Sequence, residues 1–129
     1  MKVQLLTLDK PNHNNRIYPR AVWEKAIAKY EADFISKNRA IVTSRIPEST
    51  TVNINDAVAL VKEIKTEGDT VTAEVVFLTV PNGLAMQHAL QSGALSLRSH
   101  GTGTLTKQAD GTYLIGEDYE ILSCFLTNE

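Results

Sequence analysis

The stretch "LSLRSHGTG", residues 95–103, gathers side chains that could do chemistry. It holds two serines, an arginine and a histidine beside two glycines. A serine becomes a nucleophile when a base takes its proton, and backbone amides beside it can stabilise an oxyanion. In a strand, Leu97 and Ser99 would face one way, and Arg98 and His100 the other. Ser99 and His100 would therefore not pair in an ideal strand, and a serine- and glycine-rich strand end is the commoner interpretation.

Metal and cofactor chemistry has little support elsewhere in the chain. The three histidines, His13, His88 and His100, fall in a predicted loop, helix and strand, with no ligand-like spacing between them. The single cysteine, Cys124, excludes an intrachain disulfide and a cysteine-based zinc site. No glycine-rich nucleotide-binding motif occurs. The sequence therefore predicts no metal site and no cofactor.

Composition bounds the class of protein. The 129 residues are 43% hydrophobic and 22% charged, with a net charge of −2. This length predicts one domain over residues 1–129. Nucleic acid is not an expected partner, because a phosphate-binding surface usually shows as a basic excess. No apolar run approaches the roughly 20 residues that span a bilayer, and no secretion signal opens the chain, so we expect an intracellular protein without a membrane partner.

The pattern of apolar residues predicts the elements that would position the candidate residues. One helix should begin near Pro19 and stop at Asn38, with an apolar stripe of Trp23, Ile27, Tyr30 and Phe34. A second should cover residues 80–93. Strands are predicted at 2–8, at 40–43, twice within 56–78 around a turn at 67–69, at 94–105, and once or twice within 111–128. This order indicates an α+β fold, a small antiparallel β-barrel or sheet of about six or seven strands with two helices.

Several segments, taken in order, resemble the prohead (procapsid) maturation proteases of tailed bacteriophages. They are "HNNRIYPRAVWEKAI", "SKNRAIV", "VTSRIPEST", "VNINDAVALV", "LTVPNG", "LSLRSHGTG" and "EDYEILSCFLTNE". The resemblance covers nearly the whole chain and implies a fold related to the herpesvirus assemblins. It also implies a serine protease, whose base is a histidine in an "H-P-E" turn and whose nucleophile is a serine in an "S-S-R-G" strand.

The "H-P-E" turn matches "IPE" in this chain, so Ile46 stands at the position of the histidine. The match of the serine strand without a gap puts Ser99 on the second serine and His100 on the arginine. A shifted match instead puts Ser96 on the first serine and Arg98 on the arginine. Both registers stay open.

Isoleucine cannot take a proton, so the departure at Ile46 leads to the prediction that this protein is not an enzyme. It would be a protease-fold pseudoenzyme with vestigial positions at Ile46, Ser99, Ser96 and His100. It would act by binding a phage capsid or scaffold protein, as a structural or auxiliary component of the phage head. We would then expect it in the host cytoplasm during infection or in the virion, with a homo-oligomer left open.

Two alternative functions are kept. The first is an active serine endopeptidase for procapsid maturation that uses Ser99 or Ser96 with a base at a position other than 46. The strand geometry disfavours His100 as that base. The second is a regulator or inhibitor of a phage or host protein.

Overall fold

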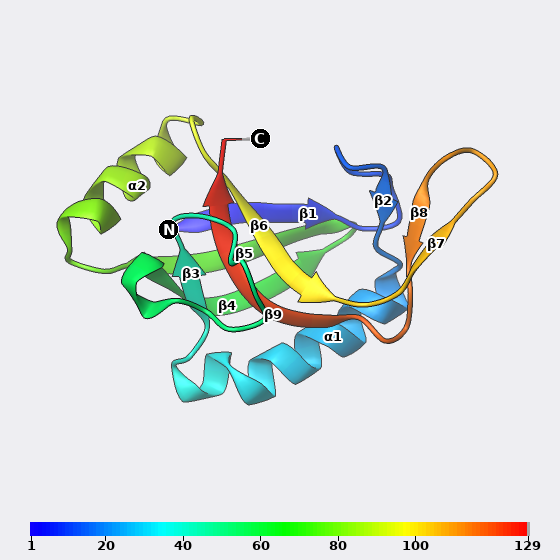
Figure 1. Ribbon diagram of the computed structural model, residues 1–129, viewed down its shortest axis with the longest axis horizontal. Helices are drawn as coiled ribbons and strands as arrows, with labels where there is room; N and C mark the ends of the chain where they lie inside the picture. The colour runs from blue at the N-terminus through cyan, green and yellow to red at the C-terminus, as the bar shows by residue number, and fades with distance from the viewer. Residues whose placement is uncertain (129) are drawn as a thin grey trace.

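The computed structural model describes residues 1–128, which form two α-helices and nine strands (Figure 1). In chain order these are β1 (Lys2–Thr7), β2 (Arg16–Ile17), α1 (Arg20–Asp33), β3 (Ile41–Thr43), β4 (Ala57–Glu67), β5 (Thr70–Phe77), α2 (Pro81–Gln91), β6 (Ser96–Thr102), β7 (Leu105–Lys107), β8 (Tyr113–Ile115) and β9 (Glu120–Thr127). Two short 3-10 helices, η1 (Ile35–Lys37) and η2 (Ile54–Asp56), flank β3 and precede β4. The α+β fold class with two helices is confirmed.

The strands form one sheet of six, in the order β1-β5-β4-β3-β9-β6, and one of three, in the order β2-β8-β7. Most pairs are antiparallel, but β3 with β9 and β2 with β8 are parallel. The sheets are thus mixed rather than wholly antiparallel, and the short strands β2 and β7 come in addition to the six or seven expected. The larger sheet curls, so that its two edge strands, β1 and β6, lie close to each other (Figure 1).

Helix α1 begins directly after Pro19, whose carbonyl oxygen accepts a hydrogen bond from the Trp23 amide at 3.0 Å. The helix ends at Asp33, before the predicted stop, because Phe34 leaves the helical conformation. Asn38 instead ends the following 3-10 turn, η1, in a left-handed conformation with φ of 55°. Trp23 and Tyr30 are buried, while Ile27 and Phe34 are partly buried against the core. The predicted stripe therefore packs on the sheet, as expected for an amphipathic helix.

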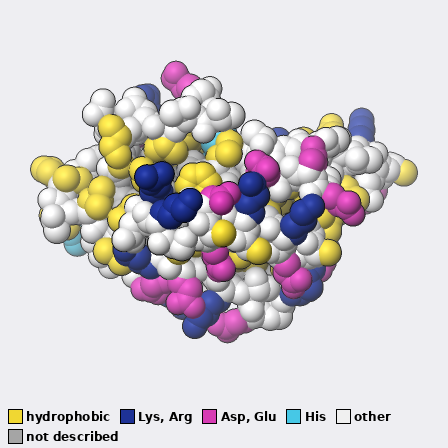
Figure 2. Space-filling view, turned by 90° about the horizontal axis from the view of Figure 1, so that it is seen from below, with side chains coloured by type: hydrophobic (Ala, Val, Ile, Leu, Met, Phe, Trp, Pro, Cys, Tyr) yellow, Lys and Arg dark blue, Asp and Glu magenta, His cyan; other side chains and the backbone are white. Residues whose placement is uncertain are grey.

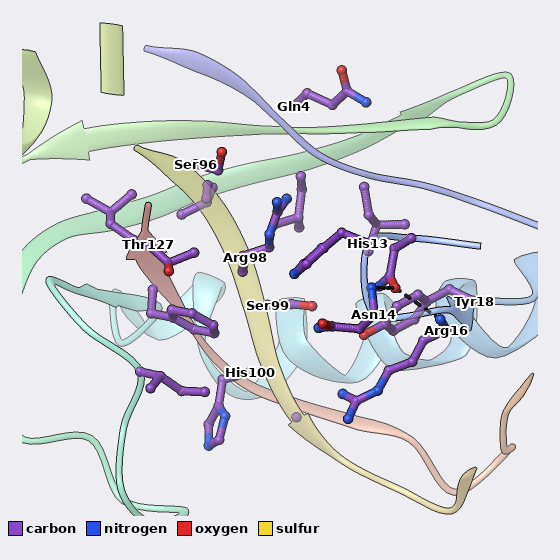
Figure 3. A pocket seen from close by; sticks show the side chains of 18 of the residues that line it. Gln4, His13, Asn14, Arg16, Tyr18, Ser96, Arg98, Ser99, His100 and Thr127 are labelled. Carbon is purple, nitrogen blue, oxygen red and sulfur yellow. Dashed lines mark hydrogen bonds between the residues drawn. The ribbon is translucent and has the colours of Figure 1, made fainter. Parts of the chain in front are cut away.

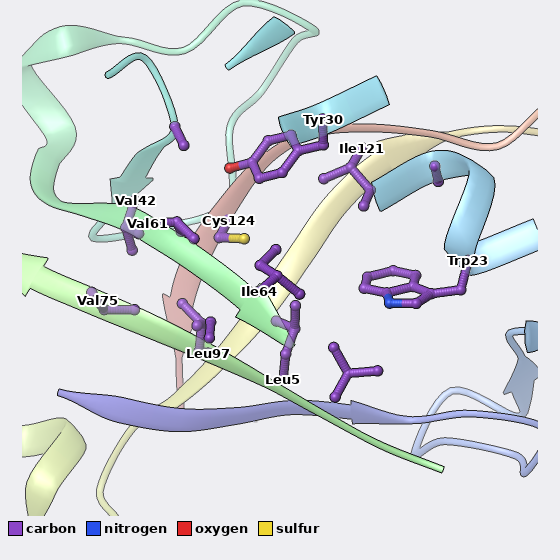
Figure 4. Packing of buried hydrophobic residues seen from close by; sticks show 14 of the residues in the cluster. Leu5, Trp23, Tyr30, Val42, Val61, Ile64, Val75, Leu97, Ile121 and Cys124 are labelled. Carbon is purple, nitrogen blue, oxygen red and sulfur yellow. The ribbon is translucent and has the colours of Figure 1, made fainter. Parts of the chain in front are cut away.

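The core lies between α1 and the inner face of the larger sheet (Figure 4). Trp23 and Tyr30 reach from the helix toward Ile121 and Cys124 of β9. Cys124 is fully buried, and this burial raises the pKa of its thiol to about 12, so the thiol is neutral. No helix among residues 1–128 has the length and apolar character needed to cross a membrane.

Candidate functional site

A cleft of about 1180 Å³ opens where the two edge strands approach each other. Its walls are β1, β6, the 12–18 loop and the turn at residues 44–46. All four positions predicted from the sequence, Ile46, Ser96, Ser99 and His100, line this one cleft. Residues more than fifty positions apart in the sequence are thus brought to one place by the curl of the sheet.

Strand β6 alternates as predicted. Leu97 is fully buried, Ser99 is half-buried, and the Ser99 hydroxyl points into the cleft toward the 12–18 loop (Figure 3). His100 points to the opposite side of the strand, where its ring lies 6.5 Å from the ring of Phe125. The expectation that Ser99 and His100 do not form a pair is confirmed by this geometry.

Tyr119 contacts the side of β6 that carries Ser99. Its hydroxyl lies 3.3 Å from Ser99 Oγ, and its ring packs between Tyr18 and Trp23, at centroid distances of 5.5 and 6.3 Å. Burial raises the pKa of Tyr119 well above its usual range. The hydroxyl is therefore neutral near pH 7, so it can donate a hydrogen bond to Ser99 but cannot serve as its base.

The two glycines of "GTG" lie where Tyr119 packs against β6. A Cβ on Gly101 would lie 2.5 Å from the carbonyl oxygen of Glu120 and 2.6 Å from the Tyr119 ring. A Cβ on Gly103 would lie 2.9 Å from the Tyr119 Cα. The sequence marked these glycines as possible oxyanion elements, whereas the structure gives them a packing role.

Asp118 fixes the end of β6 next to these glycines. The Thr104 amide donates to both carboxylate oxygens, at 2.9 and 3.1 Å, and the Thr104 hydroxyl donates at 2.7 Å. These hydrogen bonds, the amide first, lower the pKa of the Asp118 carboxyl. The "DYE" segment and the "GTG" segment are therefore one packed unit, and this unit positions Ser99.

The 12–18 loop faces β6 across the cleft and carries His13 and Asn14, which the sequence reasoning assigned no role. Both side chains lie on the loop side of the cleft, and the His13 ring is directed toward β6 (Figure 3). Asn14 supplies amide N–H groups, and a histidine ring can exchange protons near pH 7. Nothing in the sequence signals that this loop and Ser99, eighty-odd positions later, share one cleft.

The turn that carries Ile46 is held mainly at its base. Thr43 Oγ1 donates to the Arg45 carbonyl at 2.7 Å, and Arg45 pairs with Asp56 at 3.1 Å. Ile46 itself is 56% exposed. The turn thus lies on the rim of the cleft, and its apolar side chain has little to pack against.

The charge on the face that carries α1 is mixed. Figure 2 shows lysine and arginine side chains interspersed with aspartate and glutamate on the face that carries α1. Among residues 1–128, no group of three or more histidine, cysteine, aspartate or glutamate side chains is arranged to hold a metal ion. The residues that line the cleft supply hydroxyl, imidazole, amide and guanidinium groups.

Comparisons with known proteins concern the family and the fold of this chain. The family model described as prohead core protein serine protease matches residues 4–124. The chain belongs to this family. Its fold is similar to that of the bacteriophage T4 capsid assembly protease, gp21, with a TM-score of 0.85 and 19% sequence identity, over 97% of this chain and 80% of that chain. A search of the curated proteins gives no match.

This membership contradicts the prediction that the protein is not an enzyme. The family is one of serine proteases, and the structural neighbour is a capsid assembly protease. The prediction rested on the replacement of the histidine by Ile46, and His100 was the one substitute base that was weighed. A folded chain can bring a proton acceptor to a serine from any element that borders the cleft.

Proposed function

We propose that this protein is a serine endopeptidase that cleaves phage prohead proteins during head maturation, with Ser99 as its nucleophile. One observation carries the proposal. The Ser99 hydroxyl points into the cleft from a strand whose neighbours, Tyr119, Gly101 and Gly103, are packed to hold it there. A nucleophile needs such a fixed position, because the attack geometry tolerates only small displacements.

Ser99 is favoured over Ser96 by its surroundings. Ser99 shares its side of β6 with the Tyr119 hydroxyl and faces the 12–18 loop, where a proton acceptor and amide donors are present. Ser96 is the first residue of the strand and has the opposite orientation, which it shares with Arg98 and His100. The match without a gap is therefore the register we adopt, with Ser99 on the second serine of the family motif.

The cleft suits an extended polypeptide. β6 is an edge strand, paired with β9 on one side, and β1 is the other edge of the same sheet. An edge strand presents amide and carbonyl groups to which a peptide can add as a further strand. A loop or tail of a prohead protein in extended form would thus place its carbonyl carbons beside Ser99. We infer that the encounter takes place in the host cytoplasm, where proheads assemble, and that residues 1–129 act as one domain.

The test uses the purified protein with phage scaffold and capsid proteins, and mass spectrometry to identify the cleaved bonds. We expect cleavage at defined sites, lost in Ser99→Ala and kept in Ser96→Ala, with circular dichroism to confirm that both variants are folded. Removing the nucleophile should lower the rate by roughly 10⁴-fold or more. The proposal is overturned if the folded wild-type protein cleaves no prohead protein, or if Ser99→Ala cleaves as well as the wild type.

A further inference from the structure

His13 borders the same cleft as Ser99. It belongs to the loop that faces β6 across the cleft, and its ring is directed toward the strand from which the Ser99 hydroxyl projects (Figure 3). The other two histidines differ in position. His100 projects from the far side of β6 toward Phe125, and His88 belongs to α2, outside the cleft lining. Of the three histidines, His13 alone shares the cleft side of Ser99.

The loop that carries His13 is pinned at both ends. Asn12 Oδ1 accepts hydrogen bonds from the amides of Asn14 and Arg16, at 2.9 and 3.0 Å. The Asn12 amide donates to the Arg16 carbonyl at 2.9 Å. The Tyr113 amide donates to the Asn15 carbonyl at 2.7 Å, which ties the loop to β8. These bonds use backbone groups and the Asn12 side chain, so they fix the backbone beneath His13 while leaving its imidazole free to act.

The direction of the proton on Ser99 fits this arrangement. The Tyr119 hydroxyl, neutral because it is buried, can donate to Ser99 Oγ across their 3.3 Å separation. Ser99 Oγ then accepts on the core side, and its own proton is free to point outward, to the loop. A hydroxyl that accepts one hydrogen bond and donates another to a base is the arrangement that an activated serine requires.

We propose that His13 is the general base of this protein and takes the proton of Ser99. This inference rests on the proposed endopeptidase function. His13 accepts the Oγ proton as Ser99 attacks the carbonyl carbon of the scissile bond. The protonated imidazole then gives that proton to the leaving amine as the C–N bond breaks and the acyl ester remains on Ser99. Water, deprotonated by the neutral imidazole, attacks the ester, and the proton returns to Ser99 as the acid product leaves.

The ionisable groups that face the cleft allow this base to be recognised by pH. Those among the described lining residues are His13, Arg16, Tyr18, Arg45, Arg98, His100 and Tyr119. Of these lining residues, His13 and His100 are the two histidines. Replacing each histidine separately tells the two apart.

A first experiment detects the pair without needing proteolysis. In Ser99→Cys, the rate of alkylation by iodoacetamide is followed against pH by mass spectrometry. Cys124 stays unreactive because it is fully buried. A protonated imidazole beside the new thiol lowers its pKa below about 8.5. We expect His13→Ala in this background to raise the midpoint by about one unit or more, and His88→Ala to leave it unchanged. An unchanged midpoint in His13→Ala, or a shift in His100→Ala alone, overturns the inference.

A second experiment separates the base from the function. In the cleavage assay we expect His13→Ala to lower kcat by about 10²–10⁴-fold, with a smaller change in KM, and added imidazole to restore part of the rate. Cleavage that persists unchanged in His13→Ala overturns the base and leaves the endopeptidase standing. A thiol midpoint that responds to His13, in a protein whose wild type cleaves nothing, supports the pair and overturns the endopeptidase.

Discussion

The two sides of the cleft are built on different principles. We call residues 97–104 with residues 118–119 the strand wall. Its backbone and the buried Tyr119 side chain interlock so closely that two glycines have no room for a Cβ, and the Asp118 carboxylate anchors Thr104 beside them. The turn at residues 44–46 is held at its base by the pairing of Arg45 with Asp56, and it carries the exposed Ile46 at the rim of the cleft. Packing fixes the positions of the residues on the strand wall. Residues of the turn, by contrast, can be replaced with little loss of stability.

This difference suggests where catalytic groups can be lost and gained. The turn, which carries a histidine in the pattern that the chain resembles, can accept isoleucine because that side chain is 56% exposed and has little to pack against. The 12–18 loop is pinned by hydrogen bonds to the Asn12 side chain and to β8, so it can hold a histidine in a defined place. Ser99, by contrast, lies on the strand wall, where it contacts the buried Tyr119.

The largest effect is expected from removing Trp23, which packs behind the strand wall. Trp23 is fully buried and stacks on Tyr119. We expect Trp23→Ala to lower the free energy of unfolding by about 3–5 kcal/mol, because it deletes a large buried ring and leaves a cavity. Urea denaturation measures this, with exposed Lys25→Ala as the control. A loss below about 1 kcal/mol would show that the wall does not depend on α1.

A smaller effect is expected from filling the space that Tyr119 occupies. Gly101→Ala would bring a methyl group against the Glu120 carbonyl and the Tyr119 ring. We expect a loss of about 1–3 kcal/mol from overpacking, measured by the same denaturation. Thr102→Ala, at an exposed position of the same strand, is the matched control. Equal stability of the two variants would contradict the close packing of the wall.

Asp118 makes the wall sensitive to acid. Its pKa is lowered in the folded protein, so the stability it contributes is present above its unfolded pKa of about 3.9 and is lost as pH falls through the folded value. We expect Asp118→Asn to unfold at a lower Tm than the wild type at pH 7, by less than Gly101→Ala. The gap should narrow below about pH 4, as the wild-type carboxyl is protonated. A difference in Tm that stays constant from pH 7 to pH 3 would show that the ionised Asp118 carboxylate does not stabilise the strand wall.

The smallest effect is expected in the turn. Because Ile46 is 56% exposed, Ile46→Ala should change the free energy of unfolding by no more than about 0.5 kcal/mol. It should also leave the alkylation midpoint of the Ser99→Cys variant unchanged. A loss above about 1.5 kcal/mol, or a shifted midpoint, would show that the turn contributes to the cleft in a way that its exposure does not indicate.

The elements could be predicted from the sequence because local signals agree with the fold. Alternating apolar residues marked β4 and β5, Gly68 marked their turn, and Pro81 and Gly93 bounded α2. The short strands β2 and β7 were not predicted. Each forms through its pairing with β8, which no local pattern in the sequence encodes. The parallel contact of β3 with β9 likewise depends on a sheet order that no local pattern encodes.

The candidate site, too, could be predicted from the sequence only in part. Strand periodicity alone determined that Ser99 and His100 face opposite sides of β6, and the ordered segments identified the family, because both are properties of the sequence read along the chain. Only the tertiary structure decided that Tyr119 locks Ser99 in place, that "GTG" is a packing requirement, and that His13 borders the same cleft. Those relations join residues that are separated along the chain and are adjacent only once the sheet has curled. The inference drawn from Ile46 failed for that reason, since one position in a turn does not reveal which other groups the fold brings to the serine.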